Sequence, residues 1–226
     1  MNDALKATKV TKTYANKITA IKSINLTIKQ GAFHALLGPN GAGKSTLINN
    51  LATLIPTSSG TIEYFGYPST HNLHTIRALI GLVPQEINMN LFQETQNILL
   101  HQAGCQGIEP YQARKRTQQL LKRLKLWHKR HAQTRLLSGG MKRRLMIARA
   151  LVHQPKVLIL DEPTTGIDIE TRLDTWNFLK ELNQQGTTII LTTHNLEEAQ
   201  TLCHFLSIIN DGHIIRQGTM QTLLTQ

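Results

Sequence analysis

Hydrophobic and polar residues alternate in the first third of the chain, a pattern typical of strands with one buried face. In the stretch SINLTIKQG, Ile24, Leu26 and Ile28 fall on one face, and the residues between them are polar. Two further apolar runs, 33–38 and 60–68, are bounded by glycine or proline. We predict a strand for each of the three.

Apolar residues then recur at helical spacing. Leu47, Leu51 and Leu54 follow a glycine-rich turn and predict a helix that begins near residue 44. From about residue 85 to residue 150 the pattern is mainly helical. The clearest segment there is QARKRTQQLLKRLKLW.

Strands return after Pro155, and a helical run separates the first two of them. This run, ETRLDTWNFLKELNQQG, ends in Gly186, a favoured residue just after a helix. Strands that alternate with helices indicate a largely parallel sheet, so the helical block before Pro155 is predicted to be an insertion. The predicted strands are 156–160, 187–193, 205–209 and 212–215.

The charge of the chain changes this picture in one segment. Residues 110–160 hold 14 of the 25 Lys and Arg and no Asp or Glu. The rest of the chain therefore contains 11 Lys and Arg together with all 14 Asp and Glu. Such a basic block is either a solvated helical face, a surface for anionic lipid headgroups or a surface for nucleic acid. Charge alone does not separate these alternatives.

Targeting signals are not evident in the sequence. No run of about 18 apolar residues occurs, and the first ten residues lack the apolar core of a signal peptide. We therefore expect a cytosolic location.

A phosphate-binding loop lies between the apolar run 33–38 and the helix that follows. GPNGAGKST matches the pattern G-x-x-x-x-G-K-[ST] with Gly38, Gly43, Lys44 and Ser45. Glycines let successive backbone N–H groups point at phosphate oxygens, while Lys44 supplies charge and Ser45 offers a hydroxyl to Mg²⁺. The loop predicts a nucleotide site.

Two acids end the next apolar run. In VLILDEP, Asp161 emerges at the carboxyl end of a predicted buried strand, where ligands bind in open α/β sheets. Asp161 can hold the hydration shell of Mg²⁺, and Glu162 can orient or deprotonate an attacking water. His194 ends a later strand that we expect beside this one, where it could sense a γ-phosphate.

A second anion-binding helix start lies about a hundred residues after the first. In LLSGGMKRRLMIARAL, Ser138 is a good N-cap, and Gly139 and Gly140 leave N–H groups uncovered at the positive end of the helix. Met141 opens an apolar stripe along this helix.

With these motifs in order, the chain resembles the nucleotide-binding subunit of an ABC transporter over nearly its whole length. The motif LSGG distinguishes this family from generic phosphate-loop ATPases and kinases, which lack it. The resemblance implies a phosphate-loop NTPase core of the RecA-like type with an N-terminal antiparallel β region, over 1–84 and 151–226, and an inserted α-helical signature subdomain over 85–150. The motifs are GPNGAGKST, VPQE with Gln85, LSGGM at 137–141, VLILDEP, GID at 166–168 and TTH with His194.

The resemblance also assigns roles, with ATP and Mg²⁺ as ligands. Tyr14 would stack on adenine. The implied ATP contacts within the loop are Gly38, Pro39, Asn40, Gly41, Ala42, Gly43, Lys44, Ser45 and Thr46. The implied catalytic residues are Glu162, His194, Gln85 and Lys44, and the implied Mg²⁺ ligands are Ser45, Gln85 and Asp161.

In this family two cassettes pack head to tail, so a second ATPase subunit is an implied partner. Ser138, Gly139 and Gly140 would bind the γ-phosphate of the ATP held by the other subunit, and Asp168 would reach across the dimer. One cassette per chain implies that two copies, or one copy and a paralogue, make two complete sites, with a homodimer expected.

The segment from LLSGGM to GIDIETR looks most like bacterial ABC-2-type exporter ATPases. The resemblance implies export through a separate polytopic permease, whose cytoplasmic helix would meet residues 86–100. The chain would then be peripheral on the cytoplasmic face of the plasma membrane.

The alternative is a non-transport ABC ATPase that acts on nucleic acid or the ribosome, which the basic block could suit. The chain lacks the second cassette of translation-associated members and the coiled coils of DNA-repair members. Tyr111 and Trp127 are the only aromatics of the block, against the interleaving expected of single-strand binders. We expect no nucleic-acid partner.

Overall fold

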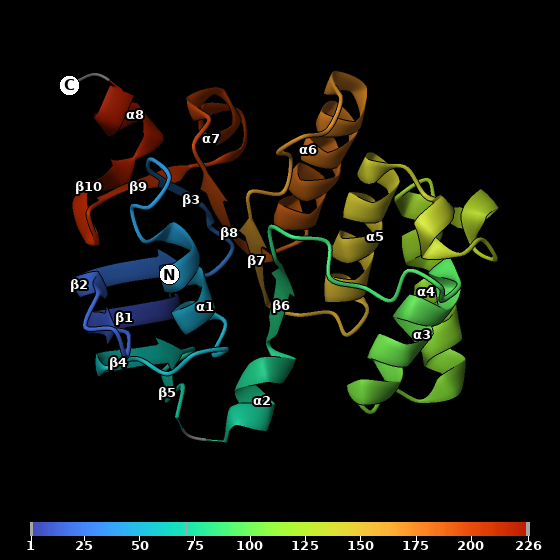
Figure 1. Ribbon diagram of the computed structural model, residues 1–226, viewed down its shortest axis with the longest axis horizontal. Helices are drawn as coiled ribbons and strands as arrows, with labels where there is room; N and C mark the ends of the chain where they lie inside the picture. The colour runs from blue at the N-terminus through green and yellow to red at the C-terminus, as the bar shows by residue number, and fades with distance from the viewer. Residues whose placement is uncertain (1, 71, 225–226) are drawn as a thin grey trace.

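The computed structural model describes residues 2–70 and 72–224, and a six-stranded sheet lies at its centre (Figure 1). The strand order is β10-β9-β3-β8-β7-β6; β10 pairs antiparallel with β9, and the other five strands run parallel. The bounds are β3 Phe33–Leu37, β6 Ile80–Val83, β7 Val157–Asp161, β8 Thr188–Thr193, β9 Phe205–Asn210 and β10 His213–Thr219. Strand β8 therefore lies between the strand that precedes the phosphate loop and the strand that carries Asp161.

The N-terminal region forms a second, antiparallel sheet in the order β2-β1-β4-β5. On β2, Ile24, Leu26 and Ile28 are buried and the residues between them are exposed, as the alternation predicts. The bounds are β1 Asp3–Thr13, β2 Thr19–Lys29, β4 Ser59–Tyr64 and β5 Tyr67–Pro68. Together the two sheets confirm the predicted fold class.

Helices cover both faces of the central sheet. Alternate residues of β7 enter different cores: Val157 and Ile159 share a cluster with α1 and the antiparallel sheet, and Leu158 and Leu160 share one with α5 and α6. A strand buried on both faces reads as a continuous apolar run, which explains VLIL. The helices are α1 Lys44–Leu51, α2 Leu73–Ala78, α3 Thr95–Cys105, α4 Pro110–Arg123, α5 Gly139–Leu151, α6 Ile169–Gln184, α7 Leu196–Leu202 and α8 Met220–Leu224.

Helices α3, α4 and α5 pack together at one end of the molecule, beside edge strand β6 (Figure 1). The prediction that helix begins near residue 85 is wrong, because residues 85–94 form an irregular segment before α3. The first helix is also shorter than predicted. It ends at Leu51, Thr53 has a φ of 56°, and Leu54 is exposed to solvent.

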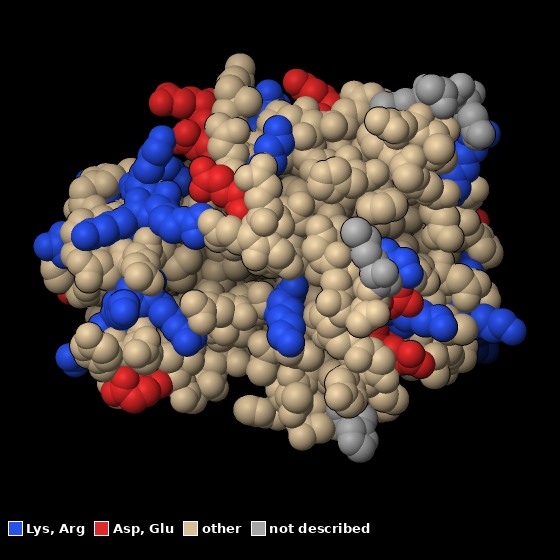
Figure 2. All heavy atoms as spheres, turned by 180° about the vertical axis from the view of Figure 1, so that it is seen from behind, with Lys and Arg blue, Asp and Glu red and all other residues tan. Residues whose placement is uncertain are grey.

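Lys and Arg gather over this helical block on the back face of the molecule (Figure 2). Several of them make intramolecular contacts: Arg123 pairs with Glu181, and Lys125 pairs with Asp174, which ties the end of α4 to α6. Part of the basic block therefore forms surface ion pairs that join α4 to α6.

Candidate nucleotide-binding site

The phosphate loop curls around its own lysine between β3 and α1. Lys44 is buried, and its Nζ donates to the carbonyls of Gly38 at 2.8 Å and Pro39 at 3.1 Å. Gly43 has a φ of 103°, and a Cβ there would lie 2.6 Å from the carbonyl oxygen of Ala20. Only glycine satisfies both conditions, so the loop needs glycine at position 43 for its own conformation and for its packing against β2.

The remaining loop residues form its exposed turn and the first turn of α1. Pro39, Asn40 and Gly41 are exposed. The N–H of Ala42 donates to Pro39, and its carbonyl accepts from Gly212. The loop is thus fixed at its base and open to solvent at its tip.

Tyr14 lies beside the start of α1. Its Oη is 3.2 Å from Oγ1 of Thr46, and Nζ of Lys12 lies 5.6 Å from the centre of its ring. Tyr14 is 39% exposed, next to the phosphate loop.

Asp161 ends β7 and Glu162 follows it, and Thr192 on the neighbouring strand β8 holds both residues. The N–H of Glu162 donates to the hydroxyl of Thr192 at 3.0 Å, and the same hydroxyl donates to Oδ1 of Asp161. Glu162 has a φ of 46°, a strained conformation for a non-glycine residue that the surrounding structure must hold. Sequence reasoning missed Thr192; the signal was a hydroxyl two residues before His194.

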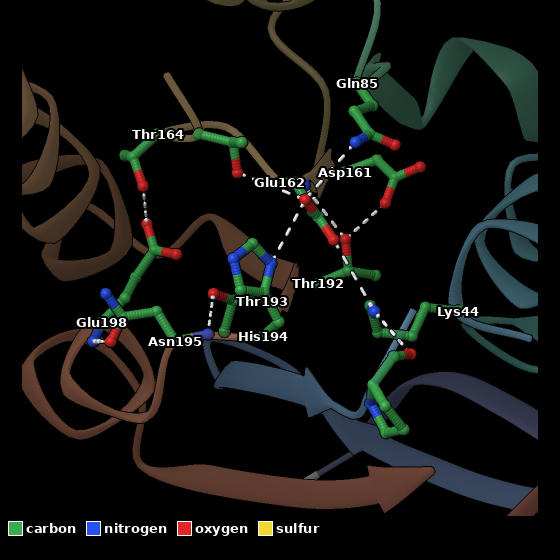
Figure 3. Close-up of polar contacts among 12 residues, drawn as sticks. Lys44, Gln85, Asp161, Glu162, Thr164, Thr192, Thr193, His194, Asn195 and Glu198 are labelled. Atoms are coloured by element: carbon green, nitrogen blue, oxygen red, sulfur yellow. Dashed lines mark hydrogen bonds and ion pairs between the residues drawn. The ribbon is translucent and has the colours of Figure 1, made fainter. Parts of the chain in front are cut away.

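Four side chains converge on the buried carboxylate of Glu162 (Figure 3). They come from the phosphate loop, the segment after β6, the loop after β7 and the end of β8. The contacts are Nζ of Lys44 at 3.6 Å, Nε2 of Gln85 at 3.4 Å, Oγ1 of Thr165 at 3.2 Å and Nδ1 of His194 at 3.4 Å. A buried carboxylate with a cation and an imidazole within 3.6 Å of it is typical of sites where a polarised water reacts.

The second helix start lies elsewhere, against the start of α6. Oγ of Ser138 accepts from the N–H of Met141 at 3.3 Å, which confirms it as the cap of α5. Asp168 caps α6, and hydrogen bonds from Thr171 lower the pKa of its carboxyl. Among the described residues, no hydrogen bond or ion pair joins Ser138 or Asp168 to the Glu162 cluster.

Arg143, on α5, is a residue that sequence reasoning missed. Its guanidinium is buried and donates to the carbonyl oxygens of Pro84 at 2.8 Å and Gln85 at 2.6 Å. Burial lowers the pKa of Arg143, and the nearby charges of Asp161 and Glu162 oppose that shift. The sequence signal was a run of bases, MKRRL, inside a helix whose remaining residues are apolar except for Arg149.

A groove of about 850 Å³ lies over the irregular segment and α3. Phe92 is 73% exposed along it, beside the partly exposed Ile87 and Leu91. Arg149 of α5 holds the segment below through both the carbonyl and the side-chain oxygen of Asn88, at 2.8 and 2.7 Å. Exposed apolar side chains around a fixed groove are typical of a protein interaction site.

Across residues 2–70 and 72–224, no helix combines the length and the apolar character needed to cross a membrane.

Comparison with known proteins agrees with this geometry. The sequence profile described as "ABC transporter" matches residues 21–165. The chain is 40% identical over 222 residues to the Nod factor export ATP-binding protein I of Paraburkholderia xenovorans, covering 98% of this chain and 72% of that protein. It is 38% identical to the linearmycin resistance ATP-binding protein LnrL of Bacillus subtilis, covering 98% and 71%.

Solved structures agree over nearly the whole chain. One is cbiO1 of Clostridium perfringens, described as part of the ABC transporter complex cbiONQ, with a TM-score of 0.89, 33% identity and coverage of 100% of this chain and 92% of that one. Another is a dimer of the ATP-binding cassette MJ0796 bound to ADP and Pi, with a TM-score of 0.88, 29% identity and coverage of 96% and 98%.

Proposed function

This chain belongs to the ABC transporter family as an ATP-binding subunit that hydrolyses ATP to drive transport, and from this premise we propose which residues perform the reaction and what they serve. The observation that carries the proposal is the convergence of Lys44, Gln85 and His194 on Glu162. Because the relatives are named for Nod factor export and linearmycin resistance, we assign the chain to export.

Lys44 binds the nucleotide by exchanging partners. In this structure its ammonium is satisfied by two carbonyl oxygens of its own loop and by Glu162. Phosphate oxygens of ATP replace these partners with more strongly charged ones, and the loop N–H groups surround them. Tyr14 stacks on the adenine beside the loop.

Glu162 orients the attacking water and accepts its proton, while His194 contacts the γ-phosphate from the other side. Nδ1 of His194 lies 3.4 Å from Oε2 of Glu162, so the two groups are already side by side at the site. The amide of Gln85 contacts the same carboxylate, so a change at Glu162 on nucleotide binding is transmitted through Gln85 to the segment that follows Gln85.

The residues at the loop fit a Mg²⁺ ion. Ser45 lies in the first turn of α1, Asp161 ends β7 and Gln85 follows the adjacent parallel strand β6, so hydroxyl, carboxylate and amide oxygens are available on one edge of the sheet. These hard oxygen donors are the ones that Mg²⁺ prefers. The ion, when bound with ATP, neutralises charge on the transferred phosphoryl group.

The signature segment acts on a second copy of the chain. Ser138, Gly139 and Gly140 complete the ATP site of the partner subunit in a head-to-tail homodimer, and Asp168 reaches across the same interface. Support comes from the separation of these residues from their own Glu162 cluster and from the dimeric state of the MJ0796 cassette.

The helical block over 85–150 forms the subdomain that meets a polytopic permease through the groove at Phe92. The apolar, exposed lining of this groove suits an amphipathic cytoplasmic helix. Binding there places the chain on the cytoplasmic face of the plasma membrane. The cbiONQ complex supports an assembly of this kind.

Glu162→Gln is the first test of the reaction. It keeps the size of the side chain but removes the proton acceptor, so hydrolysis in Mg-ATP falls by about 100-fold or more and the ATP-bound dimer accumulates. Steady-state phosphate release and light scattering after gel filtration measure the two effects. Hydrolysis at the wild-type rate contradicts the role of Glu162.

Lys44→Ala is the matched control. It removes the loop cation without touching the proton acceptor, so nucleotide affinity itself falls and no dimer forms in Mg-ATP. Unchanged affinity, measured by calorimetry, contradicts the assigned loop.

The permease is tested by affinity purification of Glu162→Gln from detergent-solubilised, nuclease-treated cells, followed by mass spectrometry. Recovery of a polytopic membrane protein supports the transport assembly. Recovery of ribosomal or DNA-repair proteins without any such membrane protein contradicts it.

A further inference from the structure

A buried carboxylate that takes no part in the reaction lies behind the site. Glu198 of α7 is 2% exposed, and its Oε1 accepts from Oγ1 of Thr164 at 2.6 Å and from Nε1 of Trp176 at 3.0 Å (Figure 3 shows the Thr164 contact). None of the ion pairs between described residues includes Glu198. Burying a carboxylate without a cation costs free energy, so the two hydrogen bonds are needed to stabilise Glu198 in the native structure.

These two bonds join three elements that carry functional residues. Thr164 lies two residues after Glu162, Trp176 belongs to the helix that Asp168 caps, and Glu198 lies four residues after His194. Asn195 fixes the start of α7, since its Oδ1 accepts from the N–H groups of Glu197 and Glu198. Glu198 is therefore the point at which the loop after β7 and the loop after β8 are held together.

A short path leads from this point to the carboxylate of Glu162. The residue after Thr164 is Thr165, whose hydroxyl donates to Oε2 of Glu162 at 3.2 Å; Nδ1 of His194 contacts the same oxygen. Glu162 has a strained backbone conformation, so the direction of its side chain depends on contacts such as these.

We propose that Glu198 is a positioning residue for ATP hydrolysis, which holds Thr164–Thr165 and His194 in register so that the carboxylate of Glu162 points into the site. The inference rests on the proposed role of Glu162. Glu198 acts as a hydrogen-bond acceptor, not as a charge, because both of its donors are neutral groups. It is separate from nucleotide binding, because none of its contacts involves the phosphate loop.

The chain offers a matched set of variants. Glu198→Gln keeps an acceptor oxygen and is expected to retain kcat within about threefold, whereas Glu198→Ala lowers kcat by about 10- to 100-fold with the KM for ATP nearly unchanged. Thr164→Val removes one donor at constant shape and lowers kcat by about three- to tenfold. Glu197→Ala, an exposed acid on the same helix, retains wild-type kcat.

All assays are run well below the melting temperature of each variant, with ATP affinity measured separately by calorimetry. Loss of kcat at unchanged affinity, with recovery in Glu198→Gln, supports positioning. Wild-type kcat in both Glu198→Ala and Thr164→Val overturns it, and so does a loss of kcat that only follows a fall in ATP affinity or folded fraction. If Glu198→Ala does not fold, Thr164→Val decides the question alone.

A double-mutant cycle with His194→Ala gives a second readout. If Glu198 acts through the His194 and Glu162 geometry, the two losses of kcat are less than multiplicative; independent, multiplicative losses overturn the inference. Glu162→Gln in the same series separates the two proposals. If Glu162→Gln is inactive while Glu198→Ala is unaffected, only the positioning role fails, whereas wild-type hydrolysis by Glu162→Gln removes the proposed role of Glu162 itself.

Discussion

Two adjacent glycines of the signature segment have different surroundings. A Cβ on Gly140 would lie 2.7 Å from Cγ2 of Thr171, whereas a Cβ on Gly139 would meet nothing within 4 Å. Gly140 therefore lets the starts of α5 and α6 pack closely, and Gly139 keeps an open surface. Gly139 is thus left to its proposed role at the dimer interface, whereas Gly140 is also needed for the packing of the fold.

Alanine substitutions separate these two roles. Gly140→Ala forces Thr171 to shift and lowers the free energy of unfolding by about 1–3 kcal/mol, the usual cost of overpacking. Gly139→Ala, in a helical backbone with free space, leaves it unchanged or raises it by about 0.5 kcal/mol. Urea denaturation of the isolated chain measures both. Equal stability of the two variants would contradict the assignment.

At the scale of elements, helix α5 links the second helix start to the segment around Gln85. Ser138 caps its beginning, Arg143 holds the carbonyls of Pro84 and Gln85, and Arg149 holds Asn88. One helix thus fixes two points of the segment that runs from the Glu162 cluster to the groove. The fork of an arginine makes two such contacts at once, which lysine does not.

Arg143→Lys and Arg143→Gln test this link. Both variants lose one or both contacts to buried carbonyls, so we expect kcat to fall by about three- to tenfold and residues 85–93 to exchange amide hydrogens faster. Lys142→Gln, a neighbouring base on α5 with no recorded contact to these carbonyls, is the control. Unchanged exchange in Arg143→Gln would argue against a clamp.

For the whole molecule, the groove and the reaction site lie on the same connected segment. The Glu162 cluster is at one end of residues 85–94, and Phe92 is exposed at the other. A partner bound in the groove can therefore sense nucleotide state through a short stretch of chain that α5 holds in place.

Phe92→Asp tests the groove. A carboxylate there opposes the burial of an apolar helix, so co-purification of the membrane partner with Glu162→Gln should fall by tenfold or more, on the order of a lost interface anchor. Tyr111→Asp, an exposed aromatic on α4, is the control. Equal recovery of the membrane protein with both variants would place the partner elsewhere.

The stability of the whole fold also depends on a histidine in the central sheet. His34 of β3 is buried against Ser207, with Nε2 2.9 Å from its hydroxyl, and burial lowers its pKa from 6.5 to about 4. The unfolded chain therefore takes up the proton first as the pH falls. The stabilising contribution of neutral His34 is complete above pH 6.5 and is lost between pH 6.5 and pH 4.

His34→Gln removes this titration. We expect the free energy of unfolding of the wild-type chain to fall by about 3 kcal/mol more than that of the variant between pH 7 and pH 4. Urea denaturation at both pH values measures the difference. Parallel pH profiles would show that His34 does not titrate in this way.

Several local features follow from neighbouring residues alone. The cap formed by Ser138 and the buried strand over VLIL are encoded by a few consecutive positions, and each was predicted from them. Two strands escaped prediction. β6 is four residues long and contains Gly81, and β1 pairs with several register shifts that break its alternation.

Contacts between side chains that lie far apart in the sequence could not be predicted from neighbouring residues alone. The sequence determined the motifs, the alternation of strands and helices and thereby the fold class, because periodicity and backbone conformation are local properties. The sequence predicted that β8 lies beside β7, but only the tertiary structure decided that β3 lies on its other side, which brings Lys44, His194 and Glu162 together. It alone assigned partners to Arg143 and Glu198, because a buried polar group is satisfied by whichever groups packing brings within hydrogen-bond distance.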